Sequence, residues 1–395
     1  MSTEFTSITT STMSEQFQKL KAFLDSLYDR FGVPAFDLLI YKEHDLLYRH
    51  MSGFSDIAKT KTVSKNDLYL LFSATKVVTS AAALQLVERE RISLSDPLSM
   101  YLPSFKDMSV AELDWNNLAE SFKKKNKRIA PASSPILIRH LLTMTAGLTY
   151  NYLAEEMETL SPHASTREVT DAIARIPLAY EPGAHWMYSL AHDVLAAVVE
   201  VASGLSFMNY LTENIFEPLG MSTPTFHIDA SKVSQLYRPG ADGSINPVPI
   251  KNHLKLSENH ESGGAGLICS AEDYALFADA LCNGGIGKTG ARILGNAMID
   301  AMSSNWLNKT QEQDFALFNR KGYSYGLGVR TLIDNTSSRS PIGEFGWDGA
   351  AGAYVLVDAK NHLCIFYAQH VLDYGSSYYE IHPALRDLTY EELGI

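Results

Sequence analysis

The stretch from Leu71 to Glu90 constrains the fold most, because a serine and a lysine open a long run of strong helix formers. Ser73 and Lys76 stand three residues apart, and alanine, leucine and valine dominate the positions up to Val87. This composition favours a helix, and its broad apolar face predicts that the helix is buried. The rest of the chain must therefore cover this helix while leaving its first turn open.

The spacing of Ser73 and Lys76 places both side chains on one side of the first helical turn. Unpaired amides at a helix start stabilise a negative oxygen, which a serine bears after it attacks a carbonyl. Apolar surroundings favour the uncharged amine of a lysine, which can accept the serine proton. Because the spacing recurs at Ser121 and Lys124, within a basic run better explained as a solvated surface, context must separate the two pairs.

Composition narrows the classes of protein. The 395 residues suffice for one large or two closely packed domains, and the net charge of -12 argues against nucleic acid or membrane partners. We find no secretory signal and no apolar run of about 18 residues or more. Cys269, Cys282 and Cys364 show no disulfide or metal spacing, so we expect reduced thiols, no metal and no cofactor. We therefore expect a cytoplasmic protein.

Strand-like runs cluster at both ends of the chain, and helical patterns fill its middle. The strands are expected at 35–41, 46–51, 325–332, 353–358 and 362–368. The helices are expected at 14–31, 166–175, 190–203, 206–216, 271–283 and 376–393. This order predicts an α/β (α+β) fold, in which terminal helices flank one antiparallel sheet beside an all-helical lobe. We predict that residues 1–70 and 285–395 form the sheet domain and residues 71–284 the helical domain, with the active site between them.

Further motifs follow the serine and lysine in a fixed order. They are His140-Leu141-Leu142-Thr143-Met144-Thr145-Ala146-Gly147-Leu148, Glu181-Pro182-Gly183, Tyr188-Ser189-Leu190-Ala191-His192-Asp193-Val194-Leu195, Ile215-Phe216-Glu217-Pro218-Leu219-Gly220-Met221, Gly263-Gly264-Ala265-Gly266-Leu267 and Gly346-Trp347-Asp348-Gly349-Ala350-Ala351-Gly352. In this order the chain resembles the serine β-lactamase and penicillin-recognising superfamily. The resemblance is closest to the class C-like branch that includes the family VIII carboxylesterases.

The resemblance implies three catalytic residues, Ser73, Lys76 and Tyr188. Ser73 is then the nucleophile, and Lys76 and Tyr188 share the handling of its proton. The backbone amides of Ser73 and Ala350 are expected to form the oxyanion hole. Without the resemblance, Tyr188 is better interpreted as a buried core tyrosine.

Two motifs depart from the β-lactamase pattern. The usual Tyr-x-Asn reads Tyr188-Ser189-Leu190, so the asparagine that contacts a substrate amide is lost. For the third motif we prefer Trp347 over Lys288, because Lys288 lies in a turn-rich loop whereas Trp347 precedes a strong strand. The substrate-binding residues that the resemblance implies are Trp347, Asp348, Gly349, Leu190 and Tyr150.

The expected function is a carboxylesterase that acts on small neutral esters through an acyl-enzyme at Ser73. The alternatives are a β-lactamase, a D-amino-acid peptidase, an acyltransferase, or an idle binding protein on the same fold. The partner is a small-molecule ester or amide in each enzymatic case. The Gly-x-Ser-x-Gly and His-Glu-x-x-His signatures of other hydrolases are absent, and His140, His185 and His192 are expected to be structural.

Overall fold

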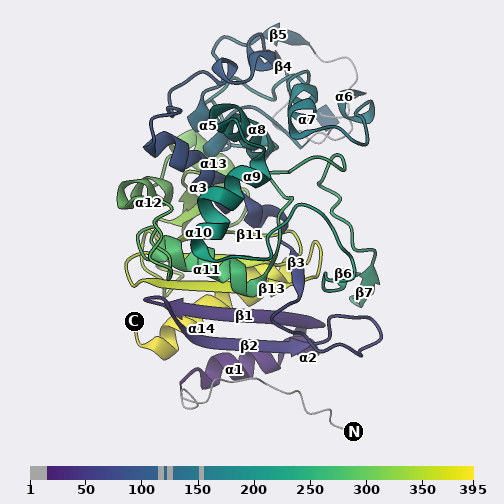
Figure 1. The fold of residues 1–395 in the computed structure, drawn as a ribbon, viewed down its shortest axis with the longest axis vertical. Helices are drawn as coiled ribbons and strands as arrows, with labels where there is room; N and C mark the ends of the chain where they lie inside the picture. Colours follow the sequence, from purple (N-terminus) through teal and green to yellow (C-terminus); the bar gives the residue numbers. More distant parts are fainter. Residues whose placement is uncertain (1–15, 114–119, 122–127, 151–154) are drawn as a thin grey trace.

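The main sheet joins the two ends of the chain (Figure 1). The computed structural model describes residues 16–113, 120–121, 128–150 and 155–395. β1 (Ala35–Lys42) and β2 (Asp45–Gly53) form a hairpin, in which both turn residues, Glu43 and His44, have a positive φ. Positive φ at both central positions matches the right-handed twist of the flanking strands. The other edge of β1 pairs with β13 (Leu363–Gln369), so the first and last strands are neighbours.

The sheet has seven strands in the order β2-β1-β13-β12-β11-β10-β9, and every neighbouring pair is antiparallel. The remaining strands are β9 (Tyr323–Tyr325), β10 (Arg330–Leu332), β11 (Phe345–Asp348) and β12 (Tyr354–Asp358). The predicted fold class is confirmed, because strands from both ends of the chain build one antiparallel sheet.

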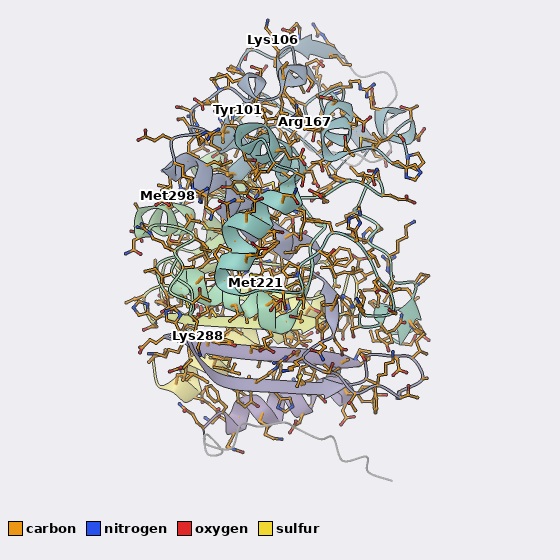
Figure 2. The ribbon with its side chains drawn as sticks, viewed as in Figure 1. Tyr101, Lys106, Arg167, Met221, Lys288 and Met298 are labelled. Atoms are coloured by element: carbon orange, nitrogen blue, oxygen red, sulfur yellow. The ribbon has the colours of Figure 1, made fainter. Side chains whose placement is uncertain are left out.

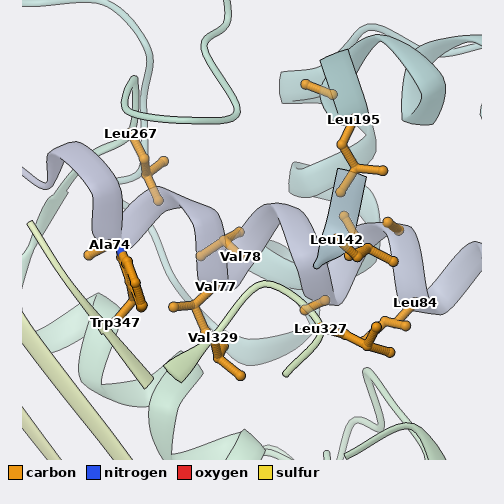
Figure 3. Packing of buried hydrophobic residues seen from close by; sticks show 14 of the residues in the cluster. Ala74, Val77, Val78, Leu84, Leu142, Leu195, Leu267, Leu327, Val329 and Trp347 are labelled. Carbon is orange, nitrogen blue, oxygen red and sulfur yellow. The ribbon is translucent and has the colours of Figure 1, made fainter. Parts of the chain in front are cut away.

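The single strand predicted over 325–332 is wrong, because two short strands, β9 and β10, stand there with a turn between them. Gly328 in this turn has a φ of +81°, and a Cβ there would lie 1.8 Å from Oγ of Ser80. Only glycine allows the turn to approach the nucleophile helix this closely. Leu327 then inserts into the core beside Leu84 (Figure 3).

The terminal helices cover one face of the sheet (Figure 1). They are α1 (Gln18–Asp25), α2 (Leu27–Phe31) and α14 (His382–Leu393), the last preceded by a π-helical turn, Ser377–Ile381. The helix predicted over 14–31 is divided at Ser26, whose hydroxyl donates to the carbonyl of Phe23 at 2.7 Å. A serine that bonds to the preceding turn competes with the helical pattern.

The opposite face of the sheet is covered by α11 (Ala271–Cys282), where Tyr274 stacks on Phe366 of β13 with ring centroids 4.4 Å apart. Thus α11 packs on the sheet, although its residues lie in the range expected for the helical domain. The division of the chain into those two domains stays a prediction.

Most other helices lie above α11 (Figure 1). The longer ones are α3 (Thr75–Glu88), α7 (Thr166–Ile173), α8 (Ala191–Ser203), α12 (Asn296–Ser303) and α13 (Lys309–Ala316). The shorter ones are α5 (Ile138–Leu142), α6 (Glu155–Glu158), α9 (Phe207–Leu211) and α10 (Glu217–Leu219), with a π-helical turn at Thr212–Phe216. The small strand pairs are β3 (Leu68–Leu70) with β8 (Ile268–Ser270), β4 (Ser109–Ala111) with β5 (Ile129–Pro131), and β6 (Leu236–Pro239) with β7 (Ile245–Val248).

The helix predicted to be buried, α3, is enclosed from Thr75 to Leu86. Its apolar side chains meet Leu195 of α8, Val329 in the turn before β10 and Leu267 before β8 (Figure 3). Packing on several sides fixes the helix rigidly, so the residues of its first turn are held by the core.

In the described part of the chain, no single helix is long and apolar enough to cross a membrane. Among those same residues, one bent pair of helices, Ala191–Ser203 with Phe207–Leu219, is long and apolar enough when taken together, and its two parts meet at 75°.

Candidate active site

Ser73 lies in a 3₁₀ turn, Phe72–Ala74, that leads directly into α3. Its side chain is almost enclosed, with 6% of the residue exposed. The residue before it, Phe72, is fully buried and has a φ of +45°. A bulky residue in this region is strained, and such strain persists only where the surroundings enforce it, as they often do at active sites. The turn therefore holds Ser73 in one fixed orientation.

Lys76 is fully buried, and its amine makes three polar contacts. Nζ lies 3.3 Å from Oγ of Ser73, 3.1 Å from the hydroxyl of Tyr150 and 2.6 Å from the carbonyl oxygen of Gly264. A neutral amine has two hydrogens and one lone pair. If the hydrogens go to Tyr150 and Gly264, the lone pair faces the hydroxyl of Ser73, which is the arrangement that a general base needs.

The hydroxyl of Tyr188 accepts a hydrogen bond of 3.0 Å from Nε1 of Trp347. The two rings stack with centroids 5.5 Å apart, and Nζ of Lys76 lies 4.6 Å from the Tyr188 ring centroid. The sequence predicts that Tyr188 shares proton handling with Lys76. In this structure, however, the phenol hydrogen-bonded to the lysine belongs to Tyr150, and the role of Tyr188 stays a prediction.

β11 brings its C-terminal end against the nucleophile turn. A Cβ on Gly349 would lie 2.3 Å from the carbonyl oxygen of Leu71, so only glycine fits there. The next residue, Ala350, lines the same cavity as Ser73. This approach puts the two predicted oxyanion-hole residues at one cavity, and their role as donors stays a prediction.

The cavity above Ser73 has a volume of about 370 Å³. Its described lining comprises Ser73, Tyr188, Leu317, Phe318, Arg320, Trp347, Asp348, Gly349, Ala350, Tyr378 and Tyr379. Arg320 is the one cationic side chain in this lining, and its guanidinium lies 2.5 Å from the carboxylate of Asp348. The pair leaves little net charge at the cavity wall.

Asp348 belongs to a buried charge cluster. Its carboxylate also lies 3.3 Å from the guanidinium of Arg330 and 3.5 Å from Nδ1 of His382. Burial alone would raise the pKa of Asp348, but Arg320, Arg330 and His382 together lower it below its ordinary value. The carboxylate is therefore ionised and held by these partners.

Other residues singled out in the sequence lie elsewhere. Leu190 caps the start of α8 in the apolar core with 1% exposure, and it is not among the described cavity residues. Lys288 lies in the loop between α11 and α12, 3.9 Å from Asp45, and Figure 2 shows it beside the sheet. Ser121 is buried, and Lys124 lies outside the described residues.

The three histidines expected to be structural have protein partners. Nδ1 of His140 accepts from the amide of Leu137 at 3.2 Å, and His185 lies 3.0 Å from Asp314. Nε2 of His192 lies 3.0 Å from the hydroxyl of Ser80. In the described ranges, no cluster of three or more His, Cys, Asp or Glu side chains has the geometry of a metal site.

Sequence reasoning missed the wall formed by Leu317, Phe318 and Arg320, which follow α13. Phe318 contributes an aromatic surface, 5.4 Å from the Tyr188 ring. The signal that could have revealed α13 is the capping box Asn308-x-x-Gln311, in which each side chain accepts from the other's backbone amide.

A buried serine and lysine at the head of a core helix, beside the edge of an antiparallel sheet, are typical of serine hydrolases and acyltransferases with the β-lactamase fold. A sequence profile of the Beta-lactamase family matches residues 20–385. The chain belongs to this family, within the serine β-lactamase and penicillin-binding-protein-like superfamily that the sequence indicates.

Curated relatives include both esterases and acyltransferases. Esterase EstB of Burkholderia gladioli is 26% identical over 411 residues, covering 94% of this chain and 95% of its own length. Acyltransferase calJ of Penicillium decumbens is 25% identical over 407 residues, with 94% of each covered. Among solved structures, the simvastatin synthase LovD of Aspergillus terreus matches with a TM-score of 0.79 at 22% identity, covering 94% of this chain and 97% of that one. This last likeness confirms the fold.

Proposed function

We propose that the protein is a carboxylesterase that acts on small neutral esters through an acyl-enzyme at Ser73. The observation that carries this proposal is the apolar, aromatic cavity wall. Trp347 is 4% exposed, and Arg320 is paired with Asp348. By its motif, Trp347 corresponds to the lysine of the β-lactam-processing branch. Binding of a neutral ester needs no cation, whereas an anionic substrate finds no unpaired cation among the cavity residues that the structure describes.

The proposed chemistry starts with proton transfer from Oγ of Ser73 to Nζ of Lys76, as the oxygen attacks the ester carbonyl carbon. The amides of Ser73 and Ala350 stabilise the resulting oxyanion. Collapse of the tetrahedral intermediate breaks the bond to the alcohol, which leaves with a proton delivered from Lys76 through Tyr188. A water molecule then attacks the acyl-enzyme by the same route, and it releases the acid and restores Ser73.

An acyltransferase is a second candidate, because an apolar rim borders the cavity. Leu317 is 87% exposed and Phe318 37% exposed, although both line the cavity. Exposed apolar side chains at the mouth of a reactive site suit an apolar alcohol better than water. The name of Acyltransferase calJ is consistent with this second candidate.

For a β-lactamase or a D-amino-acid peptidase, the described cavity residues offer no unpaired cation to a substrate carboxylate. A β-lactam or peptide carboxylate needs a cation, and loss of a charge-assisted hydrogen bond costs about 1.5–3 kcal/mol. Trp347 offers an N–H, but Tyr188 accepts it.

One experiment separates these candidates. The wild-type protein is incubated with p-nitrophenyl esters of graded chain length, with and without an added alcohol, and separately with nitrocefin, and adducts are located by mass spectrometry. Hydrolysis of esters with an adduct on Ser73 supports the esterase, and alkyl ester product in excess of acid selects the acyltransferase. Turnover of nitrocefin alone, or an adduct at Ser121, contradicts the proposal, and Ser73→Ala is the matched control.

A further inference from the structure

A continuous chain of buried hydrogen bonds leads from Lys76 to a carboxylate outside the cavity. Nζ of Lys76 donates to the carbonyl of Gly264 at 2.6 Å, and the amide of the same peptide group, on Ala265, donates to Oγ of Ser262 at 3.0 Å. That hydroxyl donates to Oδ1 of Asp193 at 2.5 Å. Every link points its donor toward the carboxylate.

The carboxylate of Asp193 lies directly behind the loop that contacts the lysine. The amide of Gly264 donates to Oδ1 at 3.3 Å, and a Cβ on Gly264 would lie 2.4 Å from Oδ2. The loop can therefore approach Asp193 only because position 264 is glycine. Lys76 and Ser262 are fully enclosed and Asp193 is 2% exposed, so bulk water screens this chain very little.

Two histidines complete the surroundings of Asp193. Nδ1 of His260 accepts from the amide of Leu256 at 3.4 Å, which leaves Nε2 protonated, and Nε2 lies 3.3 Å from Oδ1 of Asp193. Burial would raise the pKa of Asp193, but His260, Ser262 and Lys76 lower it below the ordinary value. Burial and the nearby Lys76 keep the pKa of His192 well below its ordinary range, so that ring is neutral. Asp193 is therefore a permanent negative charge close to the amine.

We propose that Asp193 is a positioning residue for Lys76, and that the chain through Ser262 and the Gly264–Ala265 peptide group transmits its negative charge to the amine. The proposal rests on the proposed function, in which Lys76 takes the proton of Ser73. Hydrogen bonds in series polarise one another, so a carboxylate at one end makes the carbonyl of Gly264 a stronger acceptor for the ammonium that forms at the other. The only proton that moves is the one that passes from Ser73 to Lys76 during acylation. The hydrogen-bond chain from Lys76 to Asp193, here called the relay, transfers no proton.

The test compares Asp193→Asn with the wild type in the pH dependence of acylation by a neutral p-nitrophenyl ester. Asparagine keeps an oxygen for Ser262 but removes the charge. We expect the plateau of kcat/KM to fall by about tenfold or more, the loss typical of one charged hydrogen bond. The acidic limb should move to lower pH, because the ammonium form of Lys76 loses the nearby charge that favours it. The substitution leaves in place the other titratable side chains near the amine, Tyr150, Tyr188 and the neutral His192.

Thr79→Val is the matched control. Oγ1 of Thr79 joins α3 to the loop of residues 262–265 by donating to the carbonyl of Gly263 at 2.7 Å. This substitution loosens the loop without touching the relay, so its acidic limb should stay at the wild-type pH. Ser262→Ala breaks the relay but keeps the carboxylate, and it carries the test if Asp193→Asn does not fold. Its limb should shift in the same direction.

The outcomes separate the two proposals. An acidic limb at the wild-type pH in the folded Asp193→Asn protein overturns the relay and leaves the esterase intact. If that variant does not fold, a wild-type limb in Ser262→Ala overturns the relay. A wild-type protein that never acylates Ser73 overturns the proposed function and the relay with it.

Discussion

Replacing Tyr188 by phenylalanine tests whether its phenol handles protons or only supports the structure. Tyr150→Phe is the matched comparison, because it removes the same hydroxyl group from a neighbouring ring. The two ring centroids are 5.6 Å apart, and both phenols are close to Lys76. The hydroxyl of Tyr150 accepts a hydrogen bond from the amine at 3.1 Å, whereas the hydroxyl of Tyr188 accepts one from Trp347.

The contacts set the expected magnitudes. Tyr150→Phe removes one of the three polar contacts of Nζ, which is worth about 1.5–3 kcal/mol and hence roughly 10- to 100-fold in acylation. In the proposed mechanism Tyr188 delivers the proton to the leaving alcohol, and general acid–base groups contribute roughly 10²- to 10⁴-fold, so Tyr188→Phe should cost that much. Combined with Lys76→Ala, each tyrosine change should add little, because each acts through the lysine.

The assay is the single-turnover release of p-nitrophenol, which isolates acylation from later steps. Thermal melting of each variant checks that the fold is intact. If Tyr188→Phe costs no more than Tyr150→Phe, the proton-handling role belongs to Tyr150. Cleanly additive losses with Lys76→Ala would show that the phenols act independently of the lysine.

Three further changes test the cavity and the scaffold. Trp347→Lys should raise the kcat/KM for nitrocefin relative to that for a neutral ester by about tenfold, since it adds a cation to an apolar wall. An unchanged ratio would contradict the proposed preference for neutral esters. Gly349→Ala should lower the free energy of unfolding by about 1–3 kcal/mol and slow acylation, because its Cβ would lie 2.3 Å from the carbonyl oxygen of Leu71. A melting temperature and an acylation rate equal to those of the wild type would show that β11 can move away freely. Burial lowers the pKa of His370 to about 4, whereas the ordinary value is 6.5. Between these two pH values the unfolded chain binds more protons than the folded one. The free energy of unfolding should therefore fall by up to roughly 3 kcal/mol as pH drops through this window. In denaturant titrations His370→Gln should flatten that slope, and an equal slope in both proteins would refute the assignment.

The sequence predicts the parts of this fold that depend on local pattern. The helix after Ser73 is buried as its composition indicates, and the strands at 35–42 and 363–369 join one sheet. The single strand predicted over 325–332 is wrong because apolar residues flank Gly326 and Gly328 and give the segment a strand-like pattern. The close approach of Gly328 to Ser80, which requires the turn, is a contact between distant residues that the pattern does not show.

In the candidate site, too, the sequence predicts contacts between residues close in the chain better than contacts between distant segments. The spacing of Ser73 and Lys76 is local, and their contact is 3.3 Å. Leu190 matched a motif position, yet its side chain lies in the core, because a motif gives a position along the chain and not a direction. Phe318 reaches the cavity through contacts between distant segments, so no spacing in the sequence indicates it.

The pairing of β1 with β13 has a consequence for how the protein is made. These strands are separated by more than three hundred residues, so their ladder can close only after nearly the whole chain has left the ribosome. Non-local pairings of this kind fold slowly, because the entropy of a long loop is lost before any contact compensates for it. Until β13 arrives, β1 presents an unpaired apolar edge, which is a template for association with other chains. A nascent chain stalled before Leu363 should therefore be the aggregation-prone form of this protein and a natural client for chaperones.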